Sequence, residues 1–141
     1  LLEVGVSEYF PHEDRMKSEH FIVKENAWRR NGSMVSDHRD FFMYGKSETI
    51  EQDRLMAYLR SIFTESAAVC LVAHNAASDI KYLGLADSFF FTIPDKFDVY
   101  DTQFLHKELR SRDQPANLQT VLEDLFGRTP ECLHNAGNDG W

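Results

Sequence analysis

The sequence has few cysteines and no long apolar run, and both shortages exclude whole classes of protein. Cys70 and Cys132 are the only cysteines; two are too few for a disulfide framework, and their surroundings lack the spacing of zinc ligands. No apolar run reaches the roughly 18 residues of a membrane-spanning helix, and no signal peptide is visible at the start. We therefore expect an intracellular protein, in the cytoplasm or nucleus, in which Cys70 is a buried thiol.

Basic residues are also scarce, since 15 lysines and arginines stand against 23 acidic residues and give a net charge of −8. This balance argues against a nonspecific nucleic-acid coat, which would be basic. It does not exclude an enzyme that acts on nucleic acid, because clustered carboxylates that hold divalent cations make a site negative before the metal arrives. With 43% apolar and 13% aromatic residues, the 141-residue chain can build one buried core, and we expect a single domain.

Hydrophobic patterns predict an α/β fold in which helices flank a mixed sheet. Short apolar runs predict strands at residues 1–7, 19–25, 67–73 and 96–101. The first two strands are expected to form an antiparallel pair, joined by a charged connection over residues 8–18. The third is a continuous apolar run, which is typical of a strand buried on both faces.

Helices are predicted at residues 49–63, 78–85, 102–109 and 117–127. The first would begin with a capping box of Thr49 and Gln52. The last would have Asn117 as its N-cap and Gly127 just past its end. Residues 26–46 have no clean period, so we expect a long ordered loop there, and such loops are often functional.

Two nearly identical hexamers stand sixty residues apart: HNAASD at residues 74–79 and HNAGND at residues 134–139. A duplicated unit is disfavoured, because the residues before the two copies differ and no longer repeat is present. The first copy follows directly from the most apolar strand, and ligand sites of α/β sheets lie beyond the carboxyl ends of strands. Asn75 and Asp79 would share one face of a helix that starts there, with Asp79 near its first turn.

In the second copy His134 and Asp139 are five residues apart, which is out of register on a straight helix. They converge if His134 lies on a loop and Asp139 on the next turn, with Gly137 easing the bend. An imidazole and a carboxylate at one spot suit a metal-assisted hydrolase. Each hexamer alone is more often a turn without function, but the two together favour a site.

The residues at this point resemble a known family. Residues 72–83, VAHNAASDIKYL, resemble the second motif of the DEDDh 3′–5′ exonucleases, which are DnaQ-like members of the ribonuclease H-like fold. Residues 133–141, LHNAGNDGW, resemble their third motif, and the run LLEVGVS resembles the second strand of that fold. DVYDT is similar to the strand end between the motifs, and NLQTVLEDLFG to the helix before the third. Residues 19–48 with HNAGND are similar to a fungal, QIP-like branch, which includes an exonuclease partner of Argonaute in RNA silencing.

The resemblance implies a role for each matching residue in a two-metal site that holds Mg²⁺ or Mn²⁺ and cuts RNA or DNA from a single-stranded 3′ end. Asp79 and Asp139 would be metal-binding carboxylates, and His134 the general base for the attacking water. Asn75 would support the site or contact the terminal nucleotide. His74 resembles a supporting position behind the site.

One part of the family pattern is absent. The first motif, Asp-x-Glu, belongs to a strand ahead of LLEVGVS, and Glu3 does not replace it, because Glu3 matches the following strand. That missing strand is the centre of the family's sheet, so the runs at 1–7 and 67–73 are expected to share no neighbour. The last helix would also continue past Trp141. We therefore expect residues 1–141 to form a partial exonuclease domain, a piece of a longer protein.

Two alternatives stay open. In the first, the chain is an inactive exonuclease-fold module that binds nucleic acid or a protein partner. In the second, it is a different metal or acid–base hydrolase that uses His134 and Asp139. In the nuclease interpretation, Arg29 and Arg30 are candidates for contacts with backbone phosphates. Trp28 is as well suited to stacking on a base as to packing in the core.

Overall fold

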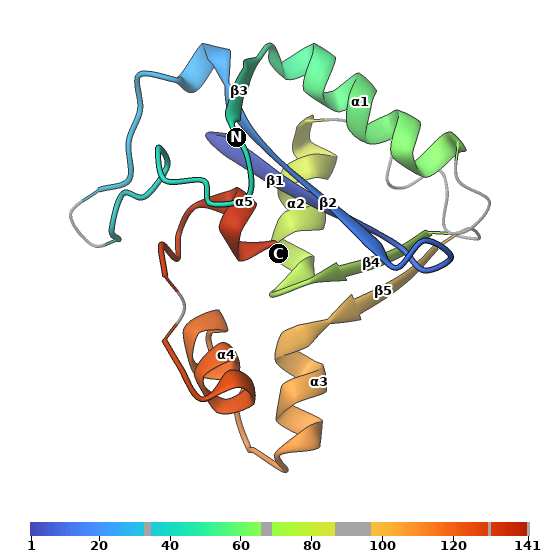
Figure 1. Cartoon of the computed structure of the whole chain (residues 1–141), viewed down its shortest axis with the longest axis vertical. Coiled ribbons are helices and arrows are strands. Elements are labelled where there is room, and N and C mark those ends of the chain that lie inside the picture. Colours follow the sequence, from blue (N-terminus) through green and yellow to red (C-terminus); the bar gives the residue numbers. More distant parts are fainter. Residues whose placement is uncertain (33–34, 66–68, 87–96, 130, 141) are drawn as a thin grey trace. The chain divides into compact units, whose positions relative to one another are not determined.

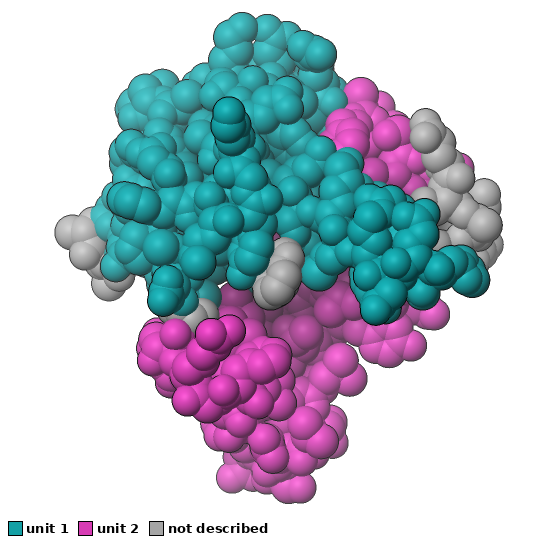
Figure 2. Space-filling model, viewed as in Figure 1, with its two compact units in different colours: residues 1–55, 130–141 teal, residues 56–129 magenta. Residues whose placement is uncertain are grey.

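The computed structural model describes residues 1–32, 35–65, 69–86, 97–129 and 131–140. The chain divides into two compact units, residues 1–55 with 130–141, and residues 56–129 (Figures 1 and 2). Each unit is an α/β assembly in which helices flank a small sheet. The fold class predicted from the sequence is therefore confirmed.

The first unit is built on a hairpin of β1 (Glu3–Phe10) and β2 (Arg15–Val23), which pair antiparallel as predicted. The predicted connection over residues 8–18 is wrong, because the strands run on until only residues 11–14 form the turn. Cross-strand polar contacts extend the hairpin. The Ser7 and Ser18 hydroxyls lie 2.9 Å apart, and the Arg15 guanidinium stacks 4.3 Å from the Phe10 ring centre.

A third strand, β3 (Ser47–Ile50), lies parallel to β2 and was not predicted. Thr49 pairs with Ile22 in this ladder, so the predicted capping box is wrong and α1 (Gln52–Glu65) starts three residues later. The Glu25 carboxylate accepts the Gln52 N–H at 3.2 Å and takes the place of the expected cap. Glu25 lies in a single 3₁₀ turn, Lys24–Asn26.

The predicted long loop follows that turn, and its described residues are ordered by two sets of hydrogen bonds. The Arg39 guanidinium donates to the carbonyls of Ala27 and Arg29, at 2.9 and 2.7 Å. The Asn135 amide donates to the carbonyls of His38 and Arg39, at 3.0 and 2.9 Å. The loop is therefore tied to the segment that carries the second hexamer.

The second unit contains parallel strands β4 (Val69–Ala73) and β5 (Phe97–Asp101) and the helices α2 (Ala76–Ala86), α3 (Thr102–Leu109) and α4 (Leu118–Phe126). All five agree with predicted elements, although residues 67 and 68 of the predicted strand lie outside the described residues. In the described part of the chain β1 pairs with β2 alone and β4 with β5 alone, so the two apolar runs lie in different sheets.

β4 is not buried on both faces, and that prediction is wrong. Cys70 is exposed, and so are Val72 and its registered partner Tyr100, with 60% of the Val72 surface accessible. One face of the β4–β5 sheet is therefore uncovered by the described residues. The predicted buried thiol of Cys70 is wrong for the same reason, because alternate side chains of a strand point to opposite faces.

The apolar face predicted for α1 is largely confirmed, since Leu55, Met56 and Leu59 are buried. In α4 Val121 is buried, whereas Leu125 is exposed. None of the helices in the described ranges is both long and apolar enough to cross a lipid bilayer.

Candidate functional site

The second hexamer forms a loop and one short helix, α5 (Ala136–Asp139), which packs on β1 and β2 within the first unit (Figure 1). Asn135 is fully buried and caps the helix, because its side-chain oxygen accepts the Asn138 N–H at 3.1 Å. His134 has a left-handed backbone, with φ 70°. This bend lets the His134 N–H donate to the Asp139 carboxylate at 3.1 Å. The Asp139 carboxylate therefore meets the backbone of His134, and the convergence of its carboxylate with the His134 imidazole stays a prediction.

The surroundings of the Asp139 carboxyl group disfavour its ionised form. Burial raises its pKa to about 6. The His134 N–H and the nearby imidazoles of His134 and His38 act against this rise, and the negative charge of Glu3 adds to it. In the described part of the chain no lysine or arginine forms an ion pair with Asp139. The imidazole of His134 is exposed and makes no hydrogen bond among the described residues.

Gly137 is required for a reason other than the predicted bend. Its φ is not in the left-handed region, so the prediction that it eases a turn is wrong. A Cβ at this position would lie 2.7 Å from the Cβ of His20 and 2.7 Å from the Phe42 ring. Only glycine therefore fits between α5, β2 and the loop. Gly5 of β1 is equally constrained, since a Cβ there would meet the Ala136 carbonyl oxygen at 1.9 Å.

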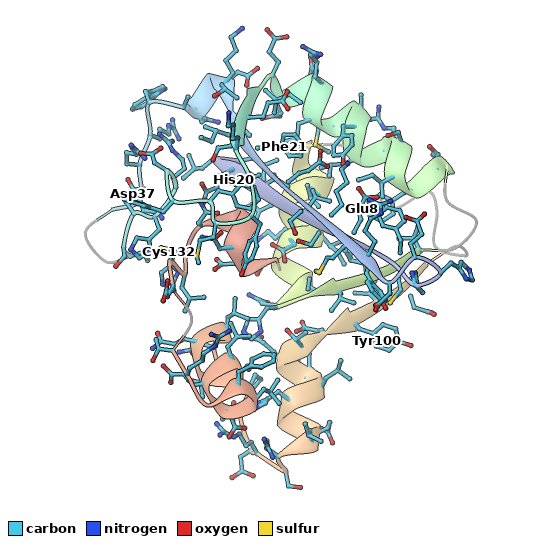
Figure 3. All side chains as sticks on the ribbon, in the orientation of Figure 1. Glu8, His20, Phe21, Asp37, Tyr100 and Cys132 are labelled. Atoms are coloured by element: carbon cyan, nitrogen blue, oxygen red, sulfur yellow. The ribbon has the colours of Figure 1, made fainter. Side chains whose placement is uncertain are left out.

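Beneath α5 lies a buried polar chain that the sequence did not reveal. The His20 imidazole points from β2 toward α5 (Figure 3) and lies 3.1 Å from Glu3 through Nε2 and 2.8 Å from the Ser47 hydroxyl through Nδ1. The other Glu3 oxygen accepts the Ala136 N–H at 3.2 Å. The sequence offers no signal for this chain, because its members come from β1, β2, β3 and α5.

The first hexamer, in the second unit, is organised by Asp101 at the end of β5. One Asp101 oxygen accepts the N–H groups of Asn75, at 3.1 Å, and Gln103, at 2.9 Å, and the other accepts the Ala76 N–H at 2.9 Å. A single carboxylate thus holds the N-termini of both α2 and α3. Asn75 has a left-handed backbone, with φ 66°, and its side-chain amide donates to the Ser78 hydroxyl at 2.8 Å.

Asp79 lies in the first turn of α2, as predicted. Burial of the carboxyl and the negative charge of Asp101 raise its pKa, although the residue as a whole is exposed. His74 lies 2.9 Å from the Thr102 hydroxyl through Nδ1, and its buried Nε2 has no partner among the described residues. Burial lowers the pKa of His74. The supporting role implied for His74 stays a prediction.

The two hexamers share one hydrogen-bonding arrangement at the start of their helices. In each, the alanine at the third position starts a helix and donates its N–H to a carboxylate from a distant strand, Asp101 for Ala76 and Glu3 for Ala136. Each helix then ends its first turn with the predicted site aspartate. Since Asp79 and Asp139 belong to different units, their convergence on one ion stays a prediction.

The predicted phosphate contacts differ in their surroundings. Arg30 forms ion pairs with Asp37 and Asp40 and lowers the pKa of Asp40 through its hydrogen bond. The Arg29 guanidinium lies 5.0 Å from the ring centre of Trp28, and it has no acidic partner among the described residues. Trp28 is 76% exposed, so packing in the core is excluded for it.

The donor set fits divalent cations in its chemistry. Asp79 and Asp139 are carboxylates with raised pKa values and without basic partners in the described ranges, and hard cations prefer such oxygen ligands. Among the described residues no three histidine, cysteine or acidic side chains gather at one point. Each unit therefore supplies one carboxylate of suitable chemistry, and the metal site itself stays a prediction.

Comparison with known proteins identifies relatives of this chain. The chain is 33% identical over 129 residues to the uncharacterized nucleolar protein C2C4.08 of Schizosaccharomyces pombe, an alignment covering 85% of this chain and 50% of that protein. It is 23% identical to Good for full DBP5 activity protein 2 and 22% identical to uncharacterized protein YDR514C, both of Saccharomyces cerevisiae. Those alignments cover the whole chain but only 31% and 35% of the two proteins.

The chain therefore spans half or less of the length of these relatives. Residues 5–141 match the DEDDh family described as DNA polymerase III subunit epsilon-like, C-terminal domain. This match includes both hexamers, Asp101 and Gly5. The chain belongs to the DEDDh family and is an exonuclease-type domain of the DNA polymerase III epsilon-like kind.

Proposed function

We propose that this domain is part of a metal-dependent 3′–5′ exonuclease that hydrolyses phosphodiester bonds of RNA or DNA from a single-stranded 3′ end. The observation that carries the proposal is the pairing of His134 with Asp139. The backbone N–H of the exposed His134 donates to a half-buried carboxylate whose pKa burial raises to about 6, and the charge of the His134 imidazole acts on that carboxylate. Family membership supports the same reaction class.

Each residue has a separate task. His134 accepts a proton from the attacking water, which requires the neutral imidazole. Asp79 and Asp139 hold Mg²⁺ or Mn²⁺, and two such ions, when bound, would favour hydroxide formation and stabilise the leaving 3′ oxygen. Asn75 contacts the terminal nucleotide or supports the site. Arg29 contacts a backbone phosphate, and Arg30 does so only by leaving Asp37 and Asp40.

The test is a nuclease assay of the intact protein on a 3′-labelled single strand with Mg²⁺ or Mn²⁺ and with EDTA. His134→Ala should lower turnover about 100- to 10,000-fold and leave cation affinity unchanged. His12→Ala is the matched control, because His12 is an exposed histidine in the turn between β1 and β2. Equal turnover of His134→Ala and the wild type would reject the base assignment, and activity that survives EDTA would reject metal dependence.

An inactive binding module is the second candidate function, and one observation favours it. Within the described residues no three histidine, cysteine or acidic side chains form a group that could hold a metal ion. This candidate predicts that the intact protein retains the labelled strand without shortening it, with or without Mg²⁺. Release of mononucleotides would exclude it.

The finer cellular assignment rests on resemblance. We propose an intracellular protein of the cytoplasm or nucleus, and one relative is named a nucleolar protein. A role in RNA silencing with an Argonaute partner follows from likeness to the QIP-like branch, and the relatives described above are fungal. Co-purification of the tagged protein with an Argonaute would support this partner, and a guide-length RNA should then be the substrate.

A further inference from the structure

Both carboxylate oxygens of Glu3 form hydrogen bonds with neighbours inside the first unit. Oε1 accepts the Ala136 N–H of α5 at 3.2 Å, and Oε2 lies 3.1 Å from Nε2 of His20. The side chain is only 15% exposed and that of His20 is fully buried. A carboxylate engaged in this way is poorly placed to bind a cation or the substrate itself.

His20 is fixed from its other side. Its Nδ1 lies 2.8 Å from the Ser47 hydroxyl, and the Phe42 ring packs against the imidazole with ring centres 5.5 Å apart. Because an ionised carboxylate only accepts hydrogen bonds, Nε2 of His20 donates to Glu3, and Nδ1 is left to form the hydrogen bond with the Ser47 hydroxyl. The direction in which Glu3 presents Oε1 to α5 is thereby set by β2 and β3.

α5 depends on such support because it is only four residues long, and one turn of helix does not persist alone. Ala136 is its first residue and Asp139 its last, and Asp139 also accepts the His134 N–H. A shift at Ala136 therefore displaces His134 and Asp139 together.

We propose that Glu3, held by His20 and Ser47, is a positioning residue for the reaction: it fixes α5, and through α5 the His134–Asp139 pair, without touching cation or substrate. This inference rests on the proposed nuclease function for its kinetic consequences. The part of the proposal that concerns structure, that Glu3 holds α5 in place, does not depend on nuclease activity.

Two conservative substitutions of Glu3 distinguish the effect of its side-chain length from the effect of its negative charge. Glu3→Gln keeps the reach, since its amide oxygen accepts the Ala136 N–H while its NH₂ donates to His20, which then donates from Nδ1 to Ser47. Glu3→Asp keeps the charge but is one methylene shorter and cannot hold both partners. We expect Glu3→Gln in the intact protein to retain most of kcat and Glu3→Asp to lose on the order of 100-fold, as a displacement of about 1 Å does, with little change in KM.

Val23→Ala is the control for stability alone. Val23 is fully buried in β2, and its apolar side chain takes no part in the hydrogen bonds that link Glu3, His20 and Ser47. It should lower the melting temperature and leave kcat unchanged. Glu3→Gln as inactive as a metal-ligand variant, with Glu3→Asp active, would overturn the proposal, since Glu3 would then act through its charge. Full activity of both variants would overturn it as well.

A second readout separates this inference from the nuclease function. In Glu3→Asp the Ala136 amide should lose protection from hydrogen exchange, and the His134 and Asp139 amide signals should shift, whereas Glu3→Gln should resemble the wild type. If the wild type has no nuclease activity, the proposed function fails and these amide signals still decide the positioning role. Unchanged protection of Ala136 in Glu3→Asp would refute it.

Discussion

The backbone N–H of His134 donates to the Asp139 carboxylate at 3.1 Å, and this contact turns a five-residue spacing into one local arrangement. The left-handed backbone of His134 makes it possible and leaves the imidazole exposed. The same carboxylate has its pKa raised to about 6 by burial. The ionised form of the Asp139 carboxyl group is therefore poorly solvated, and the first prediction concerns that group.

Asp139→Asn should stabilise the metal-free domain at pH 7 and leave its stability unchanged near pH 4. The folded state holds the proton of Asp139 up to a pKa of about 6, above the ordinary value of 3.8. Ionisation therefore costs the wild type stability as the pH rises from about 4 to 6. At about 1.4 kcal/mol per pKa unit, and with partial solvent screening, we expect a gain of about 1–2 kcal/mol at pH 7.

Urea unfolding at pH 4 and pH 7 in EDTA measures this gain. Asp113→Asn, at an exposed loop position, is the control and should show no such dependence on pH. Saturating Mg²⁺ should reverse the order at pH 7, because the cation stabilises only the wild type, by about 2.7 kcal/mol at 100 times its Kd. If the stability of Asp139→Asn relative to the wild type did not depend on pH, the raised pKa of Asp139 would be contradicted.

Asp101→Ala should destabilise the domain by about 2 kcal/mol, since it removes the cap of two helices at about 1 kcal/mol each. Asp101 accepts N–H groups at the start of both α2 and α3. Asp98→Ala, at an exposed position of the same strand, is the matched control. Equal urea midpoints for the two variants would show that Asp101 does not clamp the helices.

Gly137→Ala should cost about 1–3 kcal/mol, the usual range for overpacking, and should impair the site at the same time. The new methyl would lie 2.7 Å from His20 and from the Phe42 ring. Gly32→Ala is the control, since nothing lies within 4 Å of a Cβ there. Thermal unfolding compares the two, and similar melting temperatures would mean that α5 moves away at no cost.

Arg29→Ala should weaken binding of a single strand and reduce the slope of log K against log salt by roughly 1. Arg29 has no acidic partner in the described ranges, whereas Arg30 is paired with Asp37 and Asp40. Arg30→Ala should therefore have the smaller effect. Fluorescence anisotropy at several salt concentrations tests both, and a larger loss for Arg30→Ala would reverse the assignment.

Local signals carried the sequence prediction furthest. The bounds of α4 follow from its own caps: Asn117 accepts the Thr120 N–H at 2.8 Å, and Gly127 ends α4 with φ 68°. The antiparallel pairing of β1 and β2 follows from two neighbouring apolar runs. The same reasoning failed at Thr49, where a parallel partner 27 residues away in the ladder, Ile22, outweighed a plausible cap.

The site was predictable only in part, for a related reason. Asp79, His134 and Asp139 lie in short motifs that can be read directly. Glu3 and Asp101 hold those motifs in place from strands 133 and 25 positions away from the alanines they bind. No periodicity or spacing in a single sequence records such pairs, because they arise when distant elements meet. Cys70 was misassigned because an apolar run does not reveal which of its faces is covered.

The bond between Glu3 and Ala136 also has a temporal consequence. As the ribosome emits the chain, β1 and β2 can pair early, but the residue that Glu3 serves emerges 133 positions later. At the usual synthesis rate of about 5–20 residues per second, the nascent domain spends on the order of ten seconds without α5. α5 therefore joins β1 and β2 only after all of the second unit, which lies between them in the sequence, has been synthesised.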